Sequence, residues 1–277
     1  LTDGLPSVGI RDPERLLRIA DEQLARGVST TAMGIGEGFD DQLLSDVARR
    51  GGGGFYFLAT PEAIPAAFGA ELAGVFAIAA TGVSLGIIPE PETTSLEVLH
   101  RLVTHTMSDK IVVNVGDVAH DAPRQVLIKM GCAAPARPGR LLAKLMVRHQ
   151  GEQKGQIESH IDRLTLPATR AKTHIAAIVV ERLRIATAVA IDEAWARRAS
   201  GRGQEARTAL ADVRSAVLGA KERRLPGKRA LAALEREIDA TETALANRSR
   251  SAERQRREAR ERSQVTLLGR GPSPEKD

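Results

Sequence analysis

Leu1-Thr2-Asp3-Gly4 opens the chain, and this stretch predicts the end of a buried strand followed by a tight turn. An aspartate in such a turn lies at the carboxyl edge of a sheet, which is where open α/β sheets bind ligands. No strand residues and no initiator Met precede it in the 277 residues. We therefore expect the chain to be the C-terminal part of a larger protein, with the closest partners of Asp3 lying upstream.

Residues 1–80 alternate helix and strand signals. Asp12-Pro13-Glu14 predicts a helix start, because Asp is a favoured N-cap and Pro fits the first helical position. The elements expected after this helix are a strand at 28–35, a helix from Asp40, a strand at 55–58 and a helix at 61–76. This order indicates a parallel sheet with helices on its faces, which is half of a doubly wound α/β domain.

The pattern changes after Gly82. Short β-like runs, separated by Pro, Gly and Asp turns at a spacing of about 10–15 residues, predict an antiparallel β-sandwich over residues 82–166. The runs are 83–88, 96–106, 110–115, 125–132, 141–149 and 156–164.

From Pro167 the pattern is helical. Apolar residues at three- and four-residue steps predict helices at 168–199, 204–222 and 229–262, which we expect to form a bundle or hairpin over 167–262. Residues 263–277 are expected to be a disordered tail. Heptad-like spacing favours intramolecular packing of the last helix but also fits a short dimeric coiled coil; it involves Leu231, Leu234, Ile238, Thr241 and Leu245.

The composition excludes several classes of protein. The single cysteine, Cys132, rules out an intrachain disulfide and a cysteine-based zinc cage. The most apolar stretch, residues 72–88, is too interrupted by glycine for a membrane span. No signal peptide is visible, although one would be lost with a missing N-terminal region. We expect a cytoplasmic protein without a transmembrane segment.

No arrangement of residues points to catalysis. The six histidines have no metal-binding spacing, and no Gly-x-Ser-x-Gly nucleophile motif occurs. The run Gly34-Ile35-Gly36-Glu37-Gly38 invites a dinucleotide interpretation, but Phe39 stands where the third glycine of that motif is required. We predict a protein that is not an enzyme and has no catalytic residues.

An arginine-rich run near the end supports a second interpretation, a helical module that binds nucleic acid or an anionic membrane surface through residues 221–270. Glutamates interrupt the run, and no aromatic side chain is available to stack on bases. Glu258 and Arg262 also fit an ordinary i,i+4 pair, which favours a solvated helix face. The candidate anion-binding residues are Arg248, Arg250, Arg254, Arg256, Arg257 and Arg260.

Four segments together resemble the C-terminal half of a von Willebrand factor type A (VWA) domain, in the bacterial form followed by a β-domain and helices. They are residues 1–4, 28–44, 51–57 and 61–68. The resemblance implies a Rossmann-like fold in which Asp3 is a ligand of a metal-ion-dependent adhesion site for Mg²⁺ or a similar cation. The implied role is non-catalytic recognition of a protein partner.

The chain departs from this family in its metal ligands. The family supplies most of them from an Asp-x-Ser-x-Ser loop, and no such sequence occurs in residues 1–277. Because Mg²⁺ requires octahedral oxygen coordination and dehydrates reluctantly, Asp3 alone is not expected to hold it. Mg²⁺ is therefore expected only in the intact parent domain.

Overall fold

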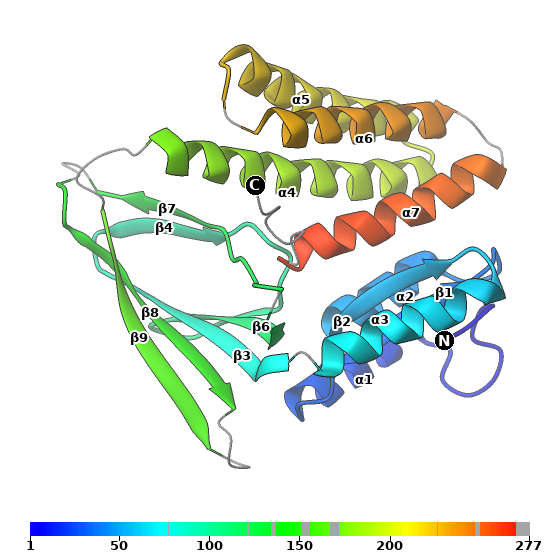
Figure 1. Cartoon of the computed structure of the whole chain (residues 1–277), viewed down its shortest axis with the longest axis horizontal. Helices are drawn as coiled ribbons and strands as arrows, with labels where there is room; N and C mark the ends of the chain where they lie inside the picture. Colours follow the sequence, from blue (N-terminus) through cyan, green and yellow to red (C-terminus); the bar gives the residue numbers. More distant parts are fainter. Residues whose placement is uncertain are drawn as a thin grey trace.

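A computed structural model describes residues 1–76, 78–120, 122–133, 137–150, 156–166, 172–225, 227–246 and 250–269 (Figure 1). It describes the backbone alone at residues 73–76, 172–176, 250 and 251. The described residues form an α/β unit, two antiparallel sheets and a helical region. The last helix of that region lies between the other long helices and the α/β unit (Figure 1).

The α/β unit has the order of elements that the sequence predicts. Asp12 caps the first helix by accepting a hydrogen bond from the Glu14 N–H at 3.2 Å, and Asp40 caps the second from the Leu43 N–H at 3.0 Å. The elements are α1 (Pro13–Ala25), β1 (Thr30–Ile35), α2 (Asp41–Arg50), β2 (Gly52–Leu58), the 3₁₀ turn η1 (Pro61–Ala63) and α3 (Ile64–Phe76).

The first residues of the chain extend the parallel sheet. β2 pairs with one side of β1, and Thr2 bridges to Gly34 on β1. The Thr2 N–H donates to the Met33 carbonyl at 3.0 Å, and the Thr2 carbonyl accepts from the Ile35 N–H at 2.9 Å. Asp3 therefore follows a strand-like residue at the carboxyl edge of the sheet, as the sequence predicts.

Glycine at the start of β2 permits the close approach of the two strands. A Cβ atom on Gly53 would stand 2.2 Å from the Thr30 carbonyl oxygen, so a larger residue there would displace one strand. The register shifts between Thr30 and Ala32, and the Thr31 hydroxyl accepts a hydrogen bond from the Gly54 N–H at 3.1 Å. The Thr31 side chain thus supplies the hydrogen-bond acceptor that the Gly54 N–H needs beside the irregular part of the strand pairing.

Residues 78–165 contain two antiparallel sheets, one with the order β5-β6-β3-β8-β9 and the other pairing β4 with β7. The larger sheet buries Ile87, Val113 and Ala143, and Leu96 of β4 and Met130 of β7 pack on this cluster. The expected antiparallel pairing is confirmed. The strands are β3 (Ile78–Pro89), β4 (Thr93–Val98), β5 (Thr104–Thr106), β6 (Ile111–Ala119), β7 (Ile128–Cys132), β8 (Leu141–Gln150) and β9 (Ile157–Thr165).

The strand predicted at 96–106 is two strands. β4 ends at Val98 and β5 begins at Thr104. Between them the Arg101 N–H donates to the Leu267 carbonyl at 2.9 Å, so this backbone bonds the end of the last helix instead of a neighbouring strand. β3 also begins before, and β7 after, the residue expected from the sequence.

The helix predicted at 229–262 is also divided. The helices are α4 (Lys172–Ala199), α5 (Gly203–Glu222), α6 (Lys228–Ala246) and α7 (Arg250–Leu267). Leu231, Leu234 and Ile238 of α6 are buried in the core that α4 and α5 share, within one chain. Helix α7 contributes Ala252 and Ala259 to the same core, and it also lies against β2 and α2 (Figure 1). None of the described helices is both long enough and apolar enough to span a membrane.

The end of α7 corrects the predicted tail. Residues 263–267 are helical rather than disordered, and Leu267 and Leu268 are buried. Leu267 packs against Ile185 and Ala188 of α4 and beside Leu127. Residues 270–277, and residues 168–171 at the expected start of the helical region, lie outside the described part of the chain.

Replacing Leu267 by Ala tests this packing. Leu267 is fully buried, and removing a buried leucine side chain costs about 2–5 kcal/mol. Val265 lies on the same helix but is 42% exposed, so Val265→Ala should change the free energy of unfolding by less than about 0.5 kcal/mol. Urea denaturation followed by circular dichroism measures both values. Equal effects of the two substitutions would contradict the burial of this end of α7.

Candidate functional site

Asp3 lies exposed at the carboxyl edge of the parallel sheet, beside the turn from β1 to α2. The Thr2 hydroxyl donates to the Gly4 carbonyl at 3.0 Å and accepts from the Gly4 N–H at 3.3 Å, which stabilises the turn around Asp3. The Asp3 carbonyl oxygen is so near Gly38 that a Cβ atom there would stand 2.6 Å from it. The β1–α2 turn is therefore the immediate neighbour of Asp3.

The side chain of Arg257, on α7, binds the main chain of this turn. It donates to the Gly36 carbonyl and to the Glu37 carbonyl, each at 2.7 Å. Its guanidinium carbon lies 4.7 Å from the centre of the Phe39 ring and 5.7 Å from that of Phe57, where cation–π attraction contributes. Arg257 is only 3% exposed, so protein groups rather than water surround its charge.

Asp41, the first residue of α2, lies between two arginines of α7. Arg256 Nη2 is 2.7 Å from Asp41 Oδ1, and Arg260 Nη1 is 3.0 Å from Asp41 Oδ2. Asp41 and Arg260 are each 5% exposed. Buried charges of this kind are stable only while they remain paired, because removing one partner leaves the other without solvation.

The same network continues to the other parts of the molecule. Arg260 Nε lies 3.6 Å from Asp192 Oδ1 of α4, and Asp192 Oδ2 lies 2.5 Å from Arg101 Nη1 in the segment between β4 and β5. Gln264 of α7 also donates to the Ser45 hydroxyl of α2 at 2.5 Å. One face of α7 thus connects the α/β unit, the helical region and the antiparallel sheets.

Glu261 joins α7 to β2, the edge strand of the parallel sheet. Burial raises the pKa of its carboxyl above the ordinary glutamate value, and a hydrogen bond at the Phe57 main chain and the charge of Arg262 oppose this rise. Burial also raises the pKa of Glu237 on α6, against the charge of Arg262, whose Nε is 3.6 Å from Glu237 Oε1. Both carboxyls therefore favour the protonated form more than exposed glutamates do.

Most of the candidate anion-binding arginines whose side chains the structure describes contact other parts of the protein more than solvent. Arg256, Arg257 and Arg260 contact α2 and the β1–α2 turn, as described above. Arg254 is largely exposed and pairs with Glu258 at 2.9 Å. Arg248 and the side chain of Arg250 lie outside the described part. The nucleic-acid or membrane interpretation has no support from these contacts.

Within the described residues, no group of three or more His, Cys, Asp or Glu side chains could hold a metal ion. The side chains present therefore do not fit Mg²⁺ by themselves, since Asp3 offers a single carboxylate.

His100 is a buried contact between the antiparallel sheets and α4. Its Nδ1 accepts a hydrogen bond from the Leu127 N–H at 3.0 Å, and its Nε2 lies 3.8 Å from Glu181 of α4. The neighbouring His100 ring lowers the pKa of the Glu181 carboxyl, with Arg184 adding to this effect against burial. The sequence placed His100 in a strand, whereas it lies in the bend after β4.

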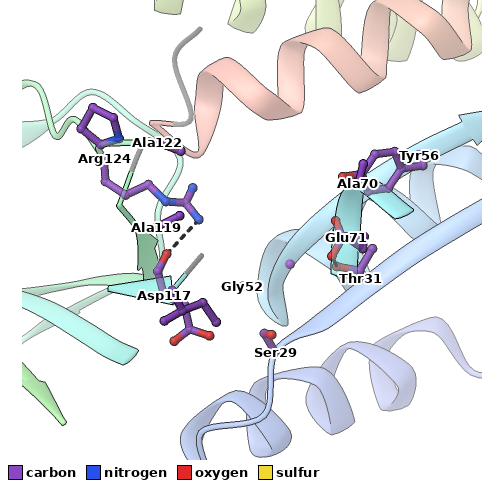
Figure 2. A pocket seen from close by; sticks show the side chains of 13 residues that line it. Ser29, Thr31, Gly52, Tyr56, Ala70, Glu71, Asp117, Ala119, Ala122 and Arg124 are labelled. Atoms are coloured by element: carbon purple, nitrogen blue, oxygen red, sulfur yellow. Dashed lines mark hydrogen bonds between the residues drawn. The ribbon is translucent and has the colours of Figure 1, made fainter. Parts of the chain in front are cut away.

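A cavity of about 240 Å³ lies at the opposite, amino edge of the parallel sheet, between the α/β unit and β6. Figure 2 shows Asp117 and Arg124 on one side of it and Thr31, Glu71 and Tyr56 on the other. The Thr31 hydroxyl donates to Glu71 at 3.1 Å, and Arg124 donates to the Asp117 carbonyl at 3.2 Å. No motif in the sequence indicates this cavity, because its residues come from widely separated segments.

The comparisons with known proteins concern the fold. No protein-family model and no curated protein matches the sequence. The chain is similar to a solved structure described as von Willebrand factor type A from Catenulispora acidiphila, with a TM-score of 0.60 at 14% identity over 86% of this chain and 56% of that one. This likeness shows a VWA-like α/β fold.

A second similar structure is that of the ArnB paralog VWA2 from Sulfolobus acidocaldarius, with a TM-score of 0.47 at 16% identity over 96% of this chain and 61% of that one. This likeness is too weak to add to the argument about the fold. The chain spans less than two thirds of the length of either structure.

The buried ion pairs predict a large effect of Arg260→Ala. This substitution leaves Asp41 with Arg256 alone and Asp192 with Arg101 alone. We expect a loss of about 3 kcal/mol in the free energy of unfolding, the low end of the cost of breaking a buried pair. Arg254→Ala is the matched control, because Arg254 is 62% exposed and its pair with Glu258 is worth at most about 1 kcal/mol. Similar losses in both variants would contradict a special role for Arg260.

The raised pKa of Glu261 predicts a pH dependence. Because the folded state holds this proton more tightly than the unfolded chain, the resulting stability is complete below the unfolded pKa and is lost as the pH rises through the folded pKa. Glu261→Gln removes this loss, so the variant should gain stability relative to the natural protein as the pH rises above the unfolded glutamate pKa of about 4.3. Thermal melts across this rise in pH measure the difference, with Glu253→Gln at an exposed position of α7 as control. A difference that shrinks with rising pH would oppose this expectation.

Proposed function

We propose that this chain is a non-catalytic, VWA-type module that binds a protein partner at the carboxyl edge of its parallel sheet. The observation that carries the proposal is the pairing of Thr2 with β1, which leaves the Asp3 carboxyl exposed at that edge. The likeness to a VWA structure supports the fold on which it rests. Open α/β sheets bind their ligands at this edge.

We propose metal-dependent binding only for the intact parent domain. The side chains described here do not by themselves form a site for Mg²⁺ or a similar cation. Asp3 is the one residue of the chain that we assign to such a site, because a carboxylate oxygen is the ligand type that Mg²⁺ prefers.

The proposal places the protein in the cytoplasm. Its one cysteine, Cys132, is free and partly buried. A free thiol in a chain without disulfides suits a reducing compartment.

Partner binding by the intact parent protein tests the proposal. We expect proteins retained by the immobilised parent in the presence of Mg²⁺ to be released by EDTA and to be absent with the Asp3→Ala variant. Glu62→Ala removes another exposed carboxylate of the α/β unit and should retain the partners. The control shows whether loss of any surface charge suffices. Unchanged retention by Asp3→Ala, with the fold intact by circular dichroism, would refute the role of Asp3.

A further inference from the structure

β9 forms one edge of the five-stranded sheet. β8 pairs with one side of it, and no described residue pairs with the other. Figure 1 shows β9 on the side of β8 that faces away from the α/β unit. Eight of the nine residues of β9 are exposed. An edge strand of this length presents a row of unpaired backbone N–H and C=O groups, which another strand can pair with.

The side chains of β9 do not block such pairing. Its sequence, Ile157 to Thr165, contains neither Lys nor Pro, and its charged residues, Glu158, Asp162 and Arg163, carry both signs, so they can pair with a second strand as well as repel one. Ile157 and Ile161 are 63% and 58% exposed. Ile161 stands opposite Met146 of β8, so both side chains lie on the same face of the sheet. The edge therefore offers apolar surface as well as backbone groups.

We propose that β9 pairs with β9 of a second copy of this chain, antiparallel across a two-fold axis at Ile161. This register pairs all nine residues of the strand. It places Ile161 opposite its own copy, and it places His160 opposite Asp162 on both sides of the axis. A histidine and a carboxylate directly opposite each other attract, and two isoleucines pack.

Other symmetric registers are poorer. A two-fold axis at His160 places Glu158 opposite Asp162, and like charges opposite each other destabilise a strand pair. An axis at Ser159 avoids that repulsion, but within β9 it pairs only residues 157–161. The full-length register is therefore the one that the order of charges and the length of β9 both favour. It joins the five-stranded sheets of the two copies into one continuous sheet.

Disulfide cross-linking tests the register, in a Cys132→Ser background that removes the natural thiol. Residues directly opposite in antiparallel strands have Cα atoms about 4.5–5.5 Å apart, within the range of about 4.4–6.8 Å that a disulfide spans. Ile161→Cys should therefore form a covalent dimer on oxidation. Ile157→Cys stands about 27 Å from its own copy in this register and should not. Ser159→Cys, at about 14 Å, should not cross-link either.

The association itself is measured by sedimentation equilibrium of the natural chain. We expect a monomer–dimer equilibrium that Ile161→Arg weakens by about tenfold or more, since it places two like charges on the axis. Ser159→Asp should tighten the dimer, because each new carboxylate faces Arg163 of the other copy. Ile178→Arg, at a 54% exposed position of α4, should leave it unchanged.

Three results would overturn the proposal. They are a monomer at all concentrations with no Ile161→Cys cross-link, a cross-link through Ser159→Cys instead, and a weaker dimer with Ser159→Asp. Because Ser159→Asp is expected to strengthen association, misfolding of a variant cannot imitate the expected result.

Discussion

The arrangement of this protein depends on one buried arginine. Arg260 of α7 is 5% exposed and lies between Asp41 of α2 and Asp192 of α4. An ion pair removed from water in this way is costly to break, because each charge then lacks both its partner and its solvation. Asp192 in turn holds Arg101 of the segment between β4 and β5. This chain of ion pairs therefore connects the α/β unit, the helices and the antiparallel sheets.

The contacts of α7 also connect this network to the candidate site. Arg257 holds the carbonyls of Gly36 and Glu37, and the next residue of that turn, Gly38, contacts the backbone of Asp3. The conformation of the turn beside Asp3 is thus tied to the position of α7. A partner that displaced this turn would have to break two charge-assisted hydrogen bonds of a buried arginine. The VWA-like edge is consequently held in one conformation by a helix from outside the α/β unit.

Local signals in the sequence were sufficient for the α/β unit. The caps at Asp12 and Asp40, the glycines at the start of β2 and the Thr2-Asp3-Gly4 turn each act within a few residues, and each indicates an element that the structure contains. The packing of α7 could not be predicted in this way, because charged side chains, Arg257 and Arg260, are buried on it beside its apolar residues. A fading apolar stripe indicates solvent in most helices, whereas here Arg256 pairs with an aspartate 215 residues earlier in the chain. The cavity lined by Glu71 and Asp117 could not be predicted either, because its residues also lie far apart in the sequence.

A double-mutant cycle between Asp41 and Arg260 tests the central claim most directly. The two residues belong to different parts of the chain and meet only if α7 lies on α2 as described. The free energies of unfolding of Asp41→Ala, Arg260→Ala and the double variant should show a coupling on the order of 1–3 kcal/mol, as expected of residues in one buried network. Additive losses, with coupling below about 0.5 kcal/mol, would contradict the role assigned to this ion pair.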